Sequence, residues 1–223
     1  EPFAALDAPT RQALLPALAA ELRAAGTAAL FVTHDLAEAL AIGDRLGVLL
    51  GGRLVQIGPT GEVLTRPATT ATARFLGVEN LLAARVVGRD GPGWRARLEA
   101  GGAELSTAAN DAIRPVPEER VVLAVRAGDV AVLPPDAEPP ADSNALAGVV
   151  SGASATPWGM RLTIAAGPDL VALAPTTLAA SAPVGARATV AVRPEAIWPL
   201  PSVACGTRPG RVAASTSGWA MRW

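Results

Sequence analysis

The spacing of apolar residues along the first part of the chain predicts helices and strands in alternation. A helical period predicts a helix from Thr10, which can cap its N-terminus, to about Ala25, with Gly26 directly after its end. Residues 28–32 form an apolar run without alternation, which is typical of a strand buried on both faces of a parallel sheet. A second, short helix is expected from Leu36 to about Ile42. This order indicates an α/β layer.

A β-hairpin is expected next. Segments 45–50 and 53–57 are its predicted strands, because the Gly-Gly pair between them suits a tight turn. Pro59 and Pro67 bracket a further helical turn. We assign residues 1–77 to one domain.

Beyond Val78 the helical period disappears, and short apolar segments are separated by Gly, Pro, Asp and Asn. We expect strands at 81–87, 94–98, 121–125, 130–133, 146–150, 161–164, 170–173 and 189–192. Many short strands separated by such turns predict an antiparallel barrel or sandwich over residues 78–200.

This second domain repeats itself. Asn80–Val86 resembles Asn144–Val150, and Leu123–Arg126 resembles Val190–Arg193 at a similar spacing. Two related β units are the simplest explanation, and they are expected at about 80–133 and 143–200.

Composition narrows the class of protein. Half of the 223 residues are hydrophobic, which is ample for a buried core. No run approaches the roughly 20 apolar residues that span a bilayer, and the single cysteine, Cys205, allows no internal disulfide, so we expect a cytoplasmic protein. The net charge of −1 gives no electrostatic case for nucleic acid. Residues 201–223 are rich in Ser, Gly and Arg without a period and are expected to be a disordered tail.

Three motifs carry the candidate chemistry. The chain opens with Glu1-Pro2-Phe3-Ala4-Ala5-Leu6-Asp7, which places two carboxylates around a loop. The only histidine, His34, follows the predicted strand 28–32, at the edge where open α/β sheets place ligand-contacting residues. The third motif is the run from Gln56 to Asn80.

In order and spacing these motifs resemble the ATP-binding subunits of ABC importers. Glu1-Pro2 is similar to the end of the Walker B motif, 4–7 to the D-loop and 31–35 to the switch-histidine loop. The run 56–80 is similar to the segment that joins the ATPase domain to an appended TOBE domain. The resemblance implies a partial P-loop-type α/β ATPase domain followed by an all-β, OB-like (TOBE) domain.

The resemblance also implies residue roles in an ABC-type ATPase. Glu1 matches the catalytic glutamate that orients or deprotonates water, His34 the donor to the γ-phosphate, and Asp7 the D-loop residue that couples two ATP sites across a dimer. Simpler interpretations stay open: Glu1 as a solvated terminus and Asp7 as a helix-entry residue. For Asp35 we prefer the simpler role of N-cap to its helix.

The family context adds cofactors and partners. It implies ATP and Mg²⁺, a second ATPase subunit, a membrane-spanning permease on the inner face of the cell membrane and, indirectly, a solute-binding protein. We identify no metal-ligand set. All 19 basic residues are arginines, so the lysine of a P-loop is missing, and we expect a fragment that binds no ATP alone.

The cargo is predicted from the second β unit, which resembles the small molybdate-binding variety of the module. Spermidine, iron, sulfate and sugar importers are the alternatives, as is a stand-alone oxyanion-binding or regulatory module. Tryptophans at strand positions are expected to pack rather than to form a sugar platform. The weak oxyanion-binding candidates are Ser143, Asn144, Thr176, Thr177, Arg126 and Arg193.

Overall fold

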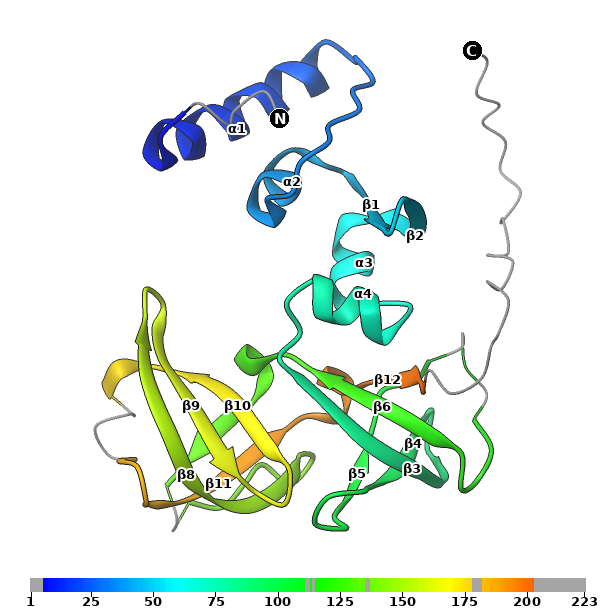
Figure 1. Cartoon of the computed structure of the whole chain (residues 1–223), viewed down its shortest axis with the longest axis vertical. Helices are drawn as coiled ribbons and strands as arrows, with labels where there is room; N and C mark the ends of the chain where they lie inside the picture. Colours follow the sequence, from blue (N-terminus) through cyan, green and yellow to red (C-terminus); the bar gives the residue numbers. More distant parts are fainter. Residues whose placement is uncertain (1–5, 111–112, 114, 135–136, 178–181, 203–223) are drawn as a thin grey trace.

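The computed structural model describes residues 6–110, 113, 115–134, 137–177 and 182–202. Glu1 and the tail 203–223 therefore lie outside the described residues. Figure 1 shows a first part with helices α1 to α4 and the β1–β2 hairpin, placed on one side of a larger β domain.

Helix α1, Ala8–Ala24, begins earlier than predicted. Its N-cap is Asp7 rather than Thr10, because the Asp7 carboxylate accepts a hydrogen bond from the Thr10 backbone N–H at 2.8 Å. At the other end, Gly26 has the positive φ of +59° that was expected after the helix. Helix α2, Leu36–Ile42, has the predicted bounds and is capped by Asp35.

The strand predicted at 28–32 is wrong for this structure, since no strand is assigned to these residues in the described part of the chain. Leu30 is 94% exposed and Val32 is 68% exposed. A run of this kind is typical of a strand between parallel neighbours, and the strand pairings among the described residues are all antiparallel. The expected α/β sheet is therefore not confirmed by the described residues of this part of the chain.

The hairpin is confirmed. Strands β1, Arg45–Leu50, and β2, Arg53–Pro59, are antiparallel. Gly51 and Gly52 both have positive φ, 55° and 73°, as the tight turn between them requires. Two short helices follow, α3 at Thr60–Thr65 and α4 at Thr70–Phe75. They close a small core formed by Leu46, Val48, Val63 and Leu76.

The β domain consists of two five-stranded antiparallel sheets. The first sheet has the order β12-β6-β3-β4-β5, with strands at Trp198–Pro201, Arg120–Val125, Asn80–Asp90, Gly93–Leu98 and Glu104–Ser106. The second has the order β10-β9-β8-β11-β7, with strands at Asp169–Ala174, Gly159–Ala165, Asn144–Thr156, Arg187–Val192 and Ala131–Leu133. Each of the eight predicted strands corresponds to one of these.

The two repeats exchange their last strands. A 3₁₀ turn, Ala127–Asp129, leads from β6 to β7, but β7 pairs with β11 of the second sheet. An equivalent turn, Pro194–Ala196, leads from β11 to β12, which pairs with β6 of the first sheet. The sheets therefore do not follow the expected division into 80–133 and 143–200.

Strands β5 and β12 were not predicted. β12 contains Pro199 and Pro201, which cannot donate backbone hydrogen bonds and argue against a strand in the sequence. It lies at the edge of its sheet and pairs only with β6, so a missing donor on its free side is tolerated.

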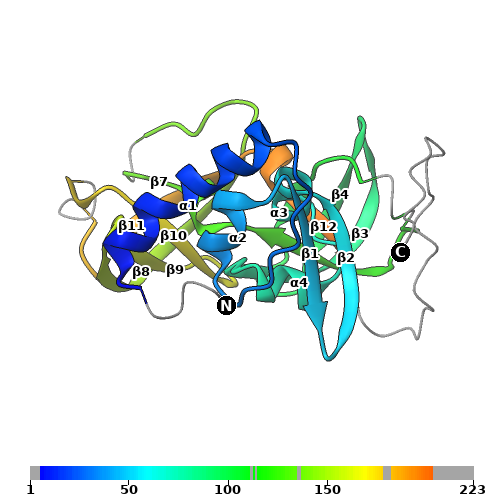
Figure 2. The same cartoon turned by 90° about the horizontal axis from the view of Figure 1, so that it is seen from above.

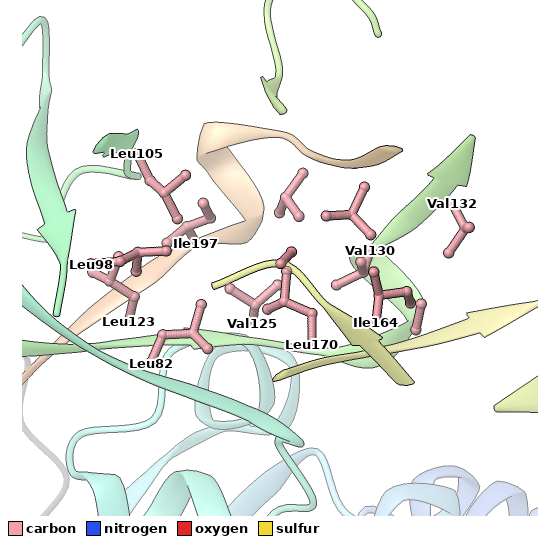
Figure 3. Close-up of a cluster of buried hydrophobic side chains, with 14 of the residues drawn as sticks. Leu82, Leu98, Leu105, Leu123, Val125, Val130, Val132, Ile164, Leu170 and Ile197 are labelled. Atoms are coloured by element: carbon pink, nitrogen blue, oxygen red, sulfur yellow. The ribbon is translucent and has the colours of Figure 1, made fainter. Parts of the chain in front are cut away.

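One hydrophobic core spans both sheets (Figure 3). Leu82, Leu98 and Leu123 come from the first sheet, and Ile164 and Leu170 from the second. Because these side chains form a single buried cluster, the two repeats do not have separate cores.

Candidate functional site

Asp7 and His34 both lie next to the packed pair of helices α1 and α2, which run side by side in Figure 2. Asp7 is exposed at the start of α1, and His34 is exposed just before the N-cap of α2. Hydrogen bonding by the side chain and then the backbone of Thr10 lowers the pKa of Asp7 below its usual value of 3.8. The helix-entry interpretation of Asp7 thus has a definite geometry.

Arg11 on α1 connects these two loops. Its Nη2 donates to the Leu6 carbonyl oxygen at 2.9 Å, directly before Asp7. Its Nη1 lies 3.3 Å from Glu38 Oε1 and 3.6 Å from Asp35 Oδ2. One guanidinium therefore touches both the loop before α1 and the first turn of α2.

Thr33 completes the contact on the side of His34. Its hydroxyl donates to Glu38 Oε2 at 2.6 Å and accepts from the Asp35 backbone N–H at 3.0 Å. Sequence reasoning named neither Arg11 nor Glu38. The sequence did contain a signal for both. Arg11 follows Asp7 by about one helical turn, and Glu38 follows His34 by the same spacing.

Only part of the ATP-site motif set expected from the sequence falls within the described residues. Glu1 lies outside the described residues, and a chain without lysine has no P-loop lysine to reach the β- and γ-phosphates. His34 and Asp7 would supply a part of such a site only.

Among the oxyanion candidates, Asn144 is engaged by backbone groups. Its Oδ1 accepts from the Ser106 N–H at 2.7 Å, and its Nδ2 donates to the carbonyl oxygens of Ser106 at 2.9 Å and Val192 at 3.2 Å. The Ser143 hydroxyl donates to the Pro140 carbonyl oxygen at 2.7 Å. These contacts fit a structural role for both residues at the start of β8, which begins at Asn144.

Both candidate arginines line one pocket, of about 580 Å³, between α3 and the β domain. Arg126 Nη2 donates to the Leu64 carbonyl oxygen at 2.8 Å, whereas Arg193 is exposed. Three carboxylates share this pocket, so it has more acidic than basic groups and does not favour an oxyanion. These are Asp129, Asp142 and Glu195. Thr176 and Thr177 are exposed and do not line it.

The tryptophans differ in their packing. Trp94 is buried, with the Arg89 guanidinium 4.2 Å from its ring centre. Trp198 is half-buried and donates to the Pro67 carbonyl oxygen at 3.2 Å. Trp158, in the turn between β8 and β9, is 87% exposed, so the packing expectation fails there.

Sequence comparison gives the family context. No family model matches the chain. A molybdate/tungstate import ATP-binding protein, WtpC of Thermococcus kodakarensis, is 48% identical over 89 residues, which are 40% of this chain and 27% of the relative. The curated proteins that this chain matches are ATP-binding subunits of ABC importers.

Other ABC importer subunits align about as well. The spermidine/putrescine protein PotA 1 of Pseudomonas aeruginosa is 42% identical over 41% of this chain and 25% of its own. The Fe(3+) protein FbpC of Pseudomonas fluorescens is 45% identical over 39% of this chain and 24% of its own. The aligned part thus spans about a quarter of these relatives.

A solved structure supports the fold of the β domain. The cytoplasmic molybdate-binding protein ModG has a TM-score of 0.51 and 16% identity, covering 55% of this chain and 96% of its own. At this identity the likeness shows the fold alone, and it agrees with the predicted OB-like (TOBE) domain. Within the described residues, no helix is both long and apolar enough to cross a membrane.

Proposed function

We propose that this chain is part of the ATP-binding subunit of an ABC importer and supplies its D-loop, switch-histidine loop and TOBE domain. The observation that carries the proposal is the 48% identity to a molybdate/tungstate import ATP-binding protein. In this proposal Glu1 orients the attacking water, His34 contacts the γ-phosphate, and Asp7 couples the two sites of a homodimer. ATP and Mg²⁺ bind only together with a P-loop.

The proposed setting is cytoplasmic, at the inner face of the membrane, in contact with a permease that receives solute from a binding protein. We propose an oxyanion such as molybdate as cargo, because three of the relatives are molybdate/tungstate import proteins. The fold of ModG is compatible with this cargo. The relatives favour this importer role over a stand-alone binding module.

A chimera tests the proposal. The P-loop-containing part of PotA 1 of Pseudomonas aeruginosa would be joined to residue 1 of this chain, and Mg²⁺-dependent phosphate release would be measured. We expect turnover that falls about 10²–10⁴-fold in Glu1→Gln, with nucleotide binding retained, because loss of a general base has this effect. His34→Ala should also lose turnover, whereas Arg23→Gln, which removes an exposed ion pair with Asp44, should not. A folded chimera that binds ATP but is unaffected by the first two changes would contradict the proposal.

A further inference from the structure

A continuous set of polar contacts joins the loop before α1 to the loop before α2. It runs from the Leu6 carbonyl through Arg11 and Glu38 to the Thr33 hydroxyl. We propose that Arg11 and Glu38 form a clamp that positions the loop of His34 relative to the loop of Asp7. The inference rests on the proposed function for its significance, since it makes Arg11 and Glu38 positioning residues for a site that contains His34.

The carboxylate of Glu38 is held from two sides. Its side chain is only 7% exposed, and its oxygens have separate partners: Arg11 for Oε1 and the Thr33 hydroxyl for Oε2. A buried carboxylate that loses its partner destabilises the protein strongly. Rotation of the Glu38 side chain away from Arg11 or from Thr33 is therefore opposed. The pair between Arg23 and Asp44 differs, because its side chains are 56% and 76% exposed and water screens it.

The contact reaches His34 through both of its neighbours. Thr33 is tied to Glu38, and Asp35 is tied to the Thr33 hydroxyl through its N–H. Asp35 in turn caps α2 by accepting from the Ala37 N–H at 2.8 Å. The backbone on either side of His34 is therefore fixed to the helix that carries Glu38. Such fixation matters because misplacement by about 1 Å costs an active site on the order of 10²-fold.

Hydrogen exchange of the complete 223-residue chain tests the clamp without nucleotide. The amides of residues 33–38 are followed by mass spectrometry in Arg11→Gln and Glu38→Gln, with Arg23→Gln as the matched control on the same helix. We expect exchange at least about tenfold faster than wild type in the first two, and unchanged in the control, because losing the clamp opens the loop locally. Equal exchange in Arg11→Gln and Arg23→Gln would overturn the inference.

The Thr33 hydroxyl provides a second pair of variants if the charge substitutions prevent folding. Thr33→Val keeps the shape but removes the donor to Glu38, whereas Thr33→Ser keeps the hydroxyl. His34 is the only histidine, so its ring gives one assignable set of NMR signals. We expect these signals to shift in Thr33→Val and to stay at their wild-type positions in Thr33→Ser. If valine and serine behave alike, the hydroxyl bridge has no positioning role. None of these measurements uses ATP. Failure of the chimera assay would therefore leave the clamp proposal standing, and failure of the clamp measurements would leave the proposed function standing.

Discussion

Replacing Asn80 by alanine tests how the two sheets are joined. Asn80, the first residue of β3, is 2% exposed. Its Nδ2 donates to the Val171 carbonyl oxygen at 2.9 Å, and its Oδ1 accepts from the Val171 N–H at 2.7 Å. Val171 lies in β10 of the other sheet. Asn144, the equivalent residue of the second repeat, forms the same pair of hydrogen bonds with the backbone of Ser106 in β5.

The magnitude follows from the groups left behind. Alanine removes two hydrogen bonds, each worth about 1 kcal/mol, and leaves the partly buried N–H and C=O of Val171 without that partner. We expect the free energy of unfolding to fall by about 2–4 kcal/mol in Asn80→Ala. Asn144 is half-buried, so water can replace part of its contacts, and Asn144→Ala should cost about 1–3 kcal/mol.

Urea unfolding of the complete chain, followed by tryptophan fluorescence and near-UV circular dichroism, measures these differences. Ser143→Ala is the control, because its hydroxyl donates to the carbonyl oxygen of the exposed Pro140, and it should cost less than about 1 kcal/mol. Unchanged stability in Asn80→Ala would refute the joining role. If Asn144→Ala kept its stability but abolished the heat of molybdate binding in calorimetry, Asn144 would be a ligand instead.

Four further results are expected. Gly93→Ala should unfold the β domain at lower urea, since its Cβ would lie 1.9 Å from the Thr107 carbonyl oxygen, whereas Gly88→Ala meets nothing within 4 Å and should be tolerated. An NMR titration should give Asp7 a pKa below 3.8; its contribution to stability is therefore present above that pH and lost as pH falls through the folded-state pKa. Leu30→Glu should reduce aggregation in light scattering, because Leu30 is 94% exposed. The isolated chain should release no phosphate from ATP above background, because it contains no lysine; clear turnover that is lost on Glu1→Gln would refute this.

Local patterns predicted the elements whose causes are local. Residues within a few positions of one another determine the Gly-Gly turn and the Asp35 cap. The same holds for the short apolar segments from which the β strands were predicted. The cap of α1 was misplaced by three residues because Asp7 and Thr10 are both good caps, and only the geometry shows that the carboxylate accepts from the Thr10 N–H.

Contacts distant in the sequence could not be predicted in this way. The segment 28–32 has the composition of a buried strand, but composition does not supply the strands that would flank it. Asn144 has a side chain that could bind an oxyanion. In the structure it instead accepts a hydrogen bond from the Ser106 N–H, and this contact depends on how the two repeats pack together. The Arg11–Glu38 pair likewise depends on α1 packing beside α2.

Equivalent positions in the repeats have acquired different environments because only one of them meets the first part of the chain. Arg126 Nη2 donates to the Leu64 carbonyl oxygen of α3, whereas Arg193 is exposed in the same pocket. Strand exchange adds a contact from the second repeat, since Trp198 of β12 donates to the Pro67 carbonyl oxygen and stacks 5.3 Å from the Arg66 guanidinium. The α3–α4 segment is therefore held by residues of both repeats. β12 therefore contacts both β6 of the first sheet and the α3–α4 segment, while the 3₁₀ turn at Pro194–Ala196 joins it to β11 of the second sheet.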